Sequence, residues 1–236
     1  PDLIRDIGVD AASLGLLSSA YFIAFAAFQI PLGIILDRFG PRKVESFLLL
    51  FAALGACIFA ASDTLLNLII GRALIGLGVS ACLMASFKCF VDWFPKQQIP
   101  LTNGAIMMAG GLGALTATAP IEFLLNFTDW RGIFWVFAVL TLISSFLIYF
   151  IVPERPTARK IIGDTTLHEQ LSGLLDVIRD PLFKRYVPFS VTSQGGMLAL
   201  QSLWMGPWLR DVAGLSRAET ASNLLLMTIA LASGFF

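Results

Sequence analysis

Seven apolar runs, each about 20 residues long, dominate this sequence. A helix that rises 1.5 Å per residue needs about 20 residues to cross a hydrocarbon core about 30 Å thick. Backbone inside lipid must make its hydrogen bonds within its own segment, and the runs lack the ten-residue alternation of a transmembrane barrel. We therefore expect an all-α polytopic membrane bundle. Its predicted spans are 14–36, 44–61, 65–87, 104–127, 132–152, 187–209 and 218–236.

The composition excludes a water-soluble globule. Hydrophobic residues make up 57% of the chain and charged residues 14%, which leaves too little polar surface to coat a globule. The charges balance at 16 cations and 16 anions, so no basic face for a nucleic acid is predicted. The three cysteines have no paired spacing and no histidine cluster beside them. We therefore expect no disulfide framework, no metal site and no cofactor.

The cations are unevenly distributed between the segments that flank these spans. If the turn at 37–43 is cytoplasmic, eleven Lys and Arg residues lie on that side and four on the other, with Arg72 inside a span. This excess predicts a bacterial inner-membrane protein whose 37–43 turn and 153–186 loop face the cytoplasm. The same orientation places Pro1 outside the cell without an initiator Met or signal peptide. We therefore expect one helix upstream of the chain, and a last span that is cut short.

A short charged loop follows the first span. It carries one acid, three cations and two glycines, namely Gly33, Asp37, Arg38, Gly40, Arg42 and Lys43. The charges alone fit a generic positive-inside turn with an incidental acid, or an acid that meets a cation or a helix N-terminus. The order of the residues resembles the signature loop of the major facilitator superfamily, which joins the second and third helices of that family. The resemblance implies a gating role for this loop.

Further resemblances follow in the family's order. Arg72 and Gly76 have the Arg-x-x-x-Gly spacing of the fourth helix, and Asp129-Trp130-Arg131 is similar to the start of the sixth. The resemblance implies an incomplete major facilitator fold that holds helices two to eight of twelve. It divides the chain into an N-terminal bundle without its first helix at 1–152, a central loop at 153–186 and the start of a C-terminal bundle at 187–236. A capping box and an apolar stripe at helical spacing predict an amphipathic helix in the loop.

Arg72 is the residue that points most directly to a mechanism. It lies about 10 Å along its span, where a charged side chain costs on the order of 2.5–3.5 kcal/mol. Either the side chain extends to the headgroups, or it lines a wet cavity or meets a partner. The resemblance implies proton coupling or anion binding for Arg72 and Gly76. A guanidinium stays protonated, so the proton needs an acid, for which Glu122 and the helices outside this chain are candidates.

Three polar side chains lie on one face of the predicted span 187–209. Gln194, Gln201 and Trp204 are separated by seven and three residues, a spacing that places them on one helical face. They are candidates to line a cavity for a polar ligand or to hydrogen-bond neighbouring helices. Gly195-Gly196 and Pro207 weaken this helix locally, which suits a helix that bends during gating.

Small residues recur every four positions on the span 104–127, at Ala109, Gly113 and Ala117. Such a face allows close contact between helices, and the resemblance implies a contact between the fifth and eighth helices of the family. The Gly-x-x-x-Gly-Pro signature of drug antiporters is not reproduced, because Ala119 precedes Pro120. This departure weakens the case for a multidrug exporter.

The sequence therefore predicts a secondary active transporter that moves a small organic anion or polar metabolite by alternating access, with protons as the coupling ion. The expected partners are the solute, protons and membrane lipid. Two other interpretations stay open: a transporter-like sensor that binds ligand without flux, and a drug or metabolite exporter of the same fold. No catalytic constellation and no Gly-rich phosphate loop with Lys-Ser or Lys-Thr is present. We therefore expect neither an enzyme nor an ATP-driven pump.

Overall fold

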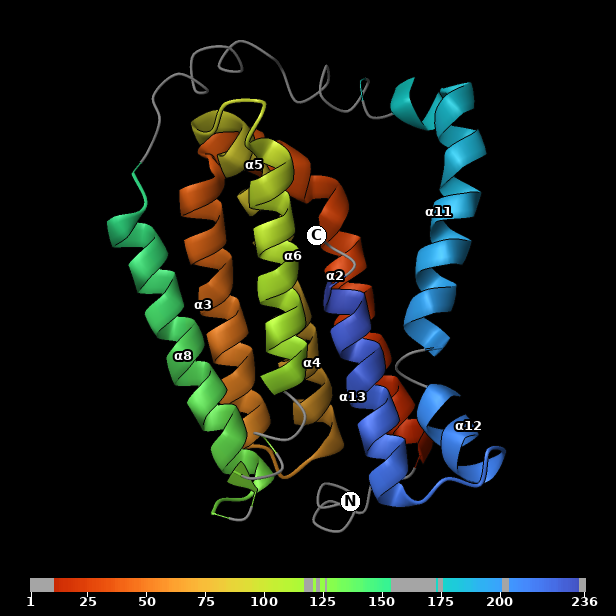
Figure 1. The fold of residues 1–236 in the computed structure, drawn as a ribbon. Coiled ribbons are helices and arrows are strands. Elements are labelled where there is room, and N and C mark those ends of the chain that lie inside the picture. The colour runs from red at the N-terminus through yellow and green to blue at the C-terminus, as the bar shows by residue number, and fades with distance from the viewer. Residues whose placement is uncertain are drawn as a thin grey trace. The chain divides into compact units, whose positions relative to one another are not determined.

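The computed structural model describes residues 11–116, 121, 124–125, 127–153, 173, 176–200 and 204–233. The regular structure of these residues is helical and contains no strand (Figure 1), which confirms the all-α prediction. The chain divides into two compact units. One comprises the described residues of Pro1–Asn103 and Thr118–Asp164, and the other those of Gly104–Ala117 and Thr165–Phe236.

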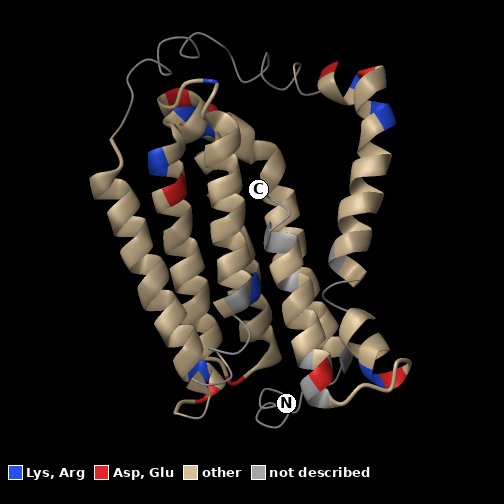
Figure 2. Ribbon diagram, viewed as in Figure 1, with Lys and Arg blue, Asp and Glu red and all other residues tan. Residues whose placement is uncertain are grey.

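The helices of the first unit overlap the predicted spans. They are α2 (Ala11–Phe39), α3 (Pro41–Ala60), α4 (Leu65–Val79), α5 (Cys82–Trp93) and α8 (Trp130–Ile151), while α6 (Ile99–Thr116) begins in this unit and continues in the other. Four described stretches are long and apolar enough to cross a membrane, namely Ala12–Phe39, Pro41–Ala60, Leu65–Trp93 and Trp130–Ile151. Figure 2 shows that the charged residues lie mainly near the helix ends.

Local sequence sets where these helices begin. Gly40 has φ 83°, in the region that favours glycine, and Pro41 follows in the first turn of α3, where its missing N–H leaves no helical hydrogen bond unmade. Thr64 caps α4, because its side chain accepts a hydrogen bond from the Asn67 backbone N–H. Asp129 caps α8 in the same way, with its Oδ1 atom 2.8 Å from the Gly132 nitrogen.

Helix α3 occupies the centre of the first unit. It packs along α4 on one side and α8 on the other, and α4 also packs along α2. Glycines bring the α3 and α4 backbones together: a Cβ atom on Gly55 would lie 2.7 Å from the Gly71 oxygen, and one on Gly78 would lie 2.3 Å from the Ala52 nitrogen. Small residues therefore replace side-chain packing with direct backbone contact between these two helices.

The predicted third span is interrupted. Helix α4 ends at Val79 and α5 begins at Cys82. Between them, the buried Ser80 donates hydrogen bonds from its nitrogen and its Oγ to the Leu77 oxygen. Its own carbonyl accepts a hydrogen bond of 3.0 Å from Gln29 Nε2 of α2. A side chain from another helix thus satisfies a carbonyl at the kink.

The second unit contains the part of α6 from Gly104 onward, α11 (Pro181–Ala199), α12 (Met205–Asp211) and α13 (Arg217–Ser233), with α12 packed against α13. The helix predicted at 187–209 is described in two parts: α11 begins earlier, at Pro181, and ends at Ala199, and α12 begins at Met205, while 201–203 lie outside the described residues. Pro207 lies in the first turn of α12, where its missing N–H is tolerated. The predicted division at 1–152, 153–186 and 187–236 stays a prediction, since most of the central loop and its amphipathic helix lie outside the described residues.

Candidate functional site

The Arg72 side chain lies among aromatic rings from three helices. Its guanidinium carbon is 4.9 Å from the ring centroid of Phe59 on α3 and 5.6 Å from that of Phe134 on α8. The two phenylalanine rings contact each other, with centroids 4.2 Å apart, and Tyr21 of α2 is near enough to interact electrostatically with Arg72. The Nε atom is buried and has no hydrogen-bond partner among the described residues. This environment favours an interior position over extension to the headgroups.

Gly76 lies one turn after Arg72 on α4 and faces α2. A Cβ atom at this position would lie 2.2 Å from the backbone oxygen of Tyr21. Only glycine therefore allows α2 to approach α4 this closely. The same contact holds Tyr21 near Arg72, so the predicted pair of Arg72 and Gly76 belongs to a single contact between α2 and α4.

Two charged residues of the signature loop contact other helices. Asp37, near the end of α2, forms an ion pair with Lys88 of α5. The guanidinium carbon of Arg42, in the first turn of α3, lies 5.0 Å from the ring centroid of Tyr149 on α8. The loop thus joins α2 to α5 and α3 to α8 at one end of the first unit.

The remaining loop residues have different environments. Arg38 lies over the ring of its neighbour Phe39, 5.7 Å from the centroid, and Gly40 adopts the positive φ that the turn requires. Lys43 lines a groove on the surface of the unit. No described residue lies within 4 Å of a Cβ atom built on Gly33, so the described part of the chain makes no close helix contact at this glycine.

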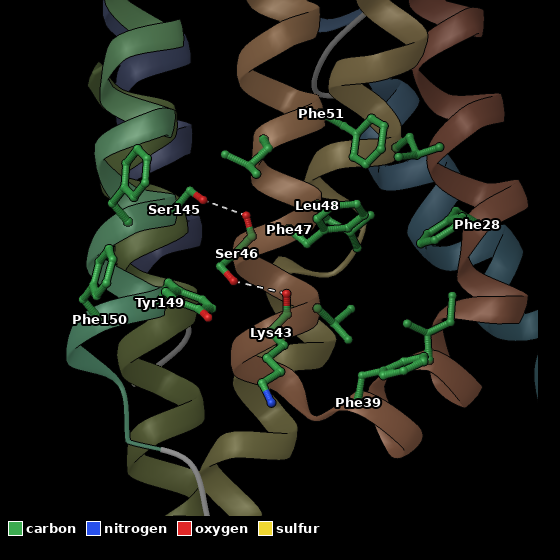
Figure 3. A pocket seen from close by; sticks show the side chains of 15 residues that line it. Phe28, Phe39, Lys43, Ser46, Phe47, Leu48, Phe51, Ser145, Tyr149 and Phe150 are labelled. Carbon is green, nitrogen blue, oxygen red and sulfur yellow. Dashed lines mark hydrogen bonds between the residues drawn. The ribbon is translucent and has the colours of Figure 1, made fainter.

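The groove at Lys43 is apolar (Figure 3). It has a volume of about 810 Å³ and lies against α2, α3 and α8, with phenylalanines such as Phe47 and Phe150 in its wall. Two residues of its lining join α8 to α3, because Ser145 Oγ donates a hydrogen bond of 2.7 Å to the Ser46 oxygen. A polar solute would lose its hydrogen bonds with water and regain few here. The groove is therefore a poor candidate for a solute site.

The start of α8 contacts the turn between α3 and α4. Arg131 donates hydrogen bonds to the Ser62 oxygen at 3.0 Å and to Asp63 Oδ1 at 2.9 Å, and its guanidinium carbon lies 4.2 Å from the ring centroid of Trp130. The Trp-Arg pair noted in the sequence thus anchors α8 against the end of α3. This contact is structural, and Arg131 serves below as a comparison for Arg72.

The polar stripe of the second unit is only partly described. Gln194 is exposed on α11, and Trp204 is 66% exposed just before α12. Gln201 lies outside the described residues. Gln194 lies on α11 and Trp204 directly before α12, and 201–203 between them lie outside the described residues, so their shared face stays a prediction. Their role in a cavity stays a prediction.

The predicted packing face on α6 has no partner in the described part of the second unit. Ala109 is exposed, and no described residue lies within 4 Å of a Cβ atom built on Gly113. Ala117 lies outside the described residues. The close helix contact expected there also stays a prediction.

The structure reveals one candidate residue that the sequence analysis missed, Glu45 of α3. Its side chain is buried, with 7% of the residue exposed, and its carboxyl group lies close enough to the thiol of Cys82 for the two groups to interact electrostatically. The available signal was an acid inside the predicted span 44–61. Glu122, the acid considered from the sequence, lies outside the described residues. Among the described residues, no group of three His, Cys, Asp or Glu side chains is placed to hold a metal ion.

Comparison with known proteins agrees with the resemblance seen in the sequence. Residues 1–236 match the family described as the Major Facilitator Superfamily. Similar proteins include the nitrate/nitrite transporter NrtP of Picosynechococcus sp., 30% identical over 48% of this chain and 21% of that protein. The probable sulfoacetate transporter SauU of Cupriavidus necator is 24% identical over 72% of this chain and 39% of its own length. The probable L-galactonate transporter of Escherichia coli is 24% identical over 96% and 50%, respectively.

The chain spans a fifth to a half of the length of these three relatives. Four of its described stretches are long and apolar enough to cross a membrane. The family match extends over every residue of the chain, and the named relatives are transporters rather than enzymes. The chain is therefore an integral membrane protein that belongs to the major facilitator superfamily.

Proposed function

We propose that the protein is a secondary active transporter of a small organic anion or polar metabolite, coupled to protons. It works by alternating access, in which two helical bundles rock around a site near the membrane midplane. The observation that carries this proposal is Arg72, a cation held inside the first unit by the faces of Phe59 and Phe134. A fixed positive charge between membrane helices is suited to binding an anionic solute.

The aromatic environment explains how this charge is tolerated. Cation–π contacts with desolvated rings contribute about 2 kcal/mol, which offsets much of the cost of placing a charge at this depth. The rings provide no hydrogen-bond acceptor, and Nε is buried without a partner among the described residues. A carboxylate that enters beside Arg72 would supply the missing acceptor as well as a countercharge.

The names of three relatives agree with an anionic solute. Nitrate, nitrite, sulfoacetate and galactonate are all anions, and the three proteins named for them match this chain. Gln194, Gln201 and Trp204 are proposed to contribute hydrogen bonds to the solute from the second bundle. The signature loop and the 153–186 loop are proposed to face the cytoplasm of a bacterial inner membrane.

The decisive experiment compares two arginines of the first unit in sealed proteoliposomes. The complete protein is reconstituted as the parent, Arg72→Gln, Arg72→Lys and Arg131→Gln, and the uptake of organic acids is recorded together with internal pH. We expect Arg72→Gln to abolish anion uptake, Arg72→Lys to retain part of it, and Arg131→Gln to retain most of it. Thermal unfolding checks that each variant is folded.

Three outcomes separate the interpretations. If a folded Arg72→Gln variant takes up anions at the same rate as the parent, the proposed role of Arg72 in anion binding is refuted. Binding of an organic acid without flux or proton movement would favour a transporter-like sensor. Flux of a neutral drug that does not depend on Arg72 would favour an exporter of the same fold.

A further inference from the structure

Glu45 presents a carboxyl group in a place where water is excluded. It lies in the second turn of α3 and is 7% exposed. Its carboxyl group lies near the thiol of Cys82, the first residue of α5, and a thiol is at best a weak hydrogen-bond donor. Its Oε2 atom is buried and has no partner among the described residues. An ionised carboxylate accepts several strong hydrogen bonds, so this environment suits the neutral acid.

The charged groups on α2 and α5 do not compensate a negative charge on Glu45. Lys88 of α5 is paired with Asp37 of α2. The other titratable neighbour on α5 is Cys89, which interacts electrostatically with Glu45 but carries no positive charge. Arg38, also on α2, lies over Phe39. No ion pair of Glu45 is found in the described part of the chain.

The groups on α3, α4 and α8 lead to the same conclusion. Arg42, one turn before Glu45 on α3, lies over the ring of Tyr149 on α8. Arg72 belongs to the aromatic cluster described above and lies ten residues before Cys82, about 15 Å away along the same span. A proton on Glu45 is therefore the simplest means of neutralising this carboxyl group in the packed state.

The carboxyl group lies beside the interruption between α4 and α5. Helix α4 is interrupted at Ser80 and Ala81, which are 1% and 0% exposed, and α5 begins at the residue that Glu45 contacts. Gln29 of α2 binds the Ser80 carbonyl, so α2 and α3 both hold this kink through side chains. Interrupted helical hydrogen bonding makes such a kink the natural place for a change of angle.

We propose that Glu45 is a proton-binding site that controls the contact between α3 and the kink at the start of α5. In the packed state, the carboxyl group keeps its proton and the contact is closed. Transfer of that proton to water leaves a carboxylate that requires hydration, and hydration separates Cys82 from Glu45. Because α5 also carries Lys88, the same movement loosens the ion pair with Asp37. The proposal rests on the proposed function, in which protons drive transport. Arg72 cannot release the coupled proton, and Glu45 supplies the acid that can.

The test measures the exposure of Cys82 rather than transport. In the complete protein, with every other cysteine replaced by serine, the rate of reaction with N-ethylmaleimide is measured from pH 5.5 to pH 8.5 in the parent and in Glu45→Gln. The reactivity of a thiol rises with pH in both proteins, so the ratio of the parent rate to the variant rate reports the opening. We expect a ratio near one at low pH that rises on the order of tenfold at high pH, since ionisation of Glu45 opens the contact.

Two comparisons make the result specific. Asp63→Asn removes an acid that is 86% exposed at its side chain, at the turn between α3 and α4, and we expect it to leave the pH dependence of Cys82 labelling unchanged. In the protein with all its cysteines, peptide mass spectrometry gives the labelling of Cys82 relative to Cys57 on α3. This ratio is measured without a substitution at Glu45. We expect it to rise with pH over the range in which the parent-to-variant ratio rises.

The outcomes are decisive for the proposal. A ratio that stays constant across the pH range, in either measurement, overturns the proton site. A parent-to-variant ratio that rises with pH, together with a Cys82-to-Cys57 ratio that rises over the same range, supports it, even if Arg72 proves unrelated to anion uptake. In the transport assay, we expect Glu45→Gln to lose accumulation driven by a pH gradient and to retain exchange of solute across the membrane. Loss of both processes by a folded variant would contradict a role limited to the proton.

Discussion

Asp37, near the end of α2, forms an ion pair with Lys88 of α5. Helix α5 is the second part of the interrupted span that begins with α4. The two residues are 51 positions apart in the sequence. The acid of the signature loop therefore has a defined partner within the first unit and is not an incidental charge in a positive-inside turn. This contact holds the middle of α5, which runs from Cys82 to Trp93, against the end of α2.

Neutralising Asp37 should affect transport more than stability. The side chains of Lys88 and Asp37 are 21% and 50% exposed, and ion pairs of this kind contribute about 1 kcal/mol or less. We expect Asp37→Asn and Lys88→Gln each to leave the thermal midpoint nearly unchanged while slowing solute uptake. The charge-reversed double variant, Asp37→Lys with Lys88→Asp, should recover part of the uptake. Failure of the double variant to improve on either single variant would show that the pair does not act in gating.

The two glycines of the family motifs should differ in their tolerance of alanine. At Gly76, a Cβ atom would lie 2.2 Å from the Tyr21 oxygen, whereas at Gly33 no described residue lies within 4 Å. Overpacking a close helix contact costs about 1–3 kcal/mol. We therefore expect Gly76→Ala to lower the thermal midpoint of the detergent-solubilised protein by several degrees and Gly33→Ala to leave it unchanged. Equal midpoints for the two variants would contradict the close approach of α2 to α4.

Much of the first unit follows from the sequence because the bilayer imposes a length on each apolar run. The predicted starts at 44, 65 and 132 lie within a few residues of Pro41, Leu65 and Trp130, the first residues of α3, α4 and α8. These starts depend on local signals, such as the proline after Gly40 and the cap at Thr64. Because such signals lie in the residues next to each helix start, the starts can be predicted from the sequence.

The interruption after Val79 could not be predicted in the same way. It depends on a hydrogen bond from Gln29, a residue of a different helix. Likewise, the sequence indicates that Arg72 is a charge inside a span, but its contacts with Phe59 and Phe134 arise only when three helices pack together. Glu45 was missed for a related reason, because its burial depends on α5 covering the start of α3.

The aromatic contacts of Arg72 can be tested on one helix. Phe134 contacts the guanidinium, whereas Phe137 lies one turn later on α8 and is 40% exposed. Replacing Phe134 with leucine keeps an apolar side chain but removes the ring face, at a cost of about 0.5–2 kcal/mol. We expect Phe134→Leu to weaken solute binding, measured by isothermal titration, by about twofold to thirtyfold. Phe137→Leu should bind as the parent does, and equal affinities for the two variants would argue against a ring that positions Arg72.

Two adjacent serines on α8 provide a matched test of how α8 is attached to α3. Ser145 is 3% exposed and donates its hydrogen bond across the interface to the Ser46 oxygen, at 2.7 Å. Ser144 is exposed and donates to the Leu140 oxygen of its own helix. Loss of the first bond leaves a carbonyl without this partner inside the interface, which costs about 1–3 kcal/mol, whereas the carbonyl of Leu140 stays within its own helix.

We therefore expect Ser145→Ala to lower the thermal midpoint and Ser144→Ala to leave it almost unchanged. The change at Ser145 removes no charge and no residue proposed to touch solute, so uptake per folded molecule should stay at the parent level in both variants. A Ser145→Ala variant as stable as the parent would mean that the carbonyl of Ser46 finds another donor. A stable variant with impaired uptake would instead indicate that α8 moves against α3 during transport.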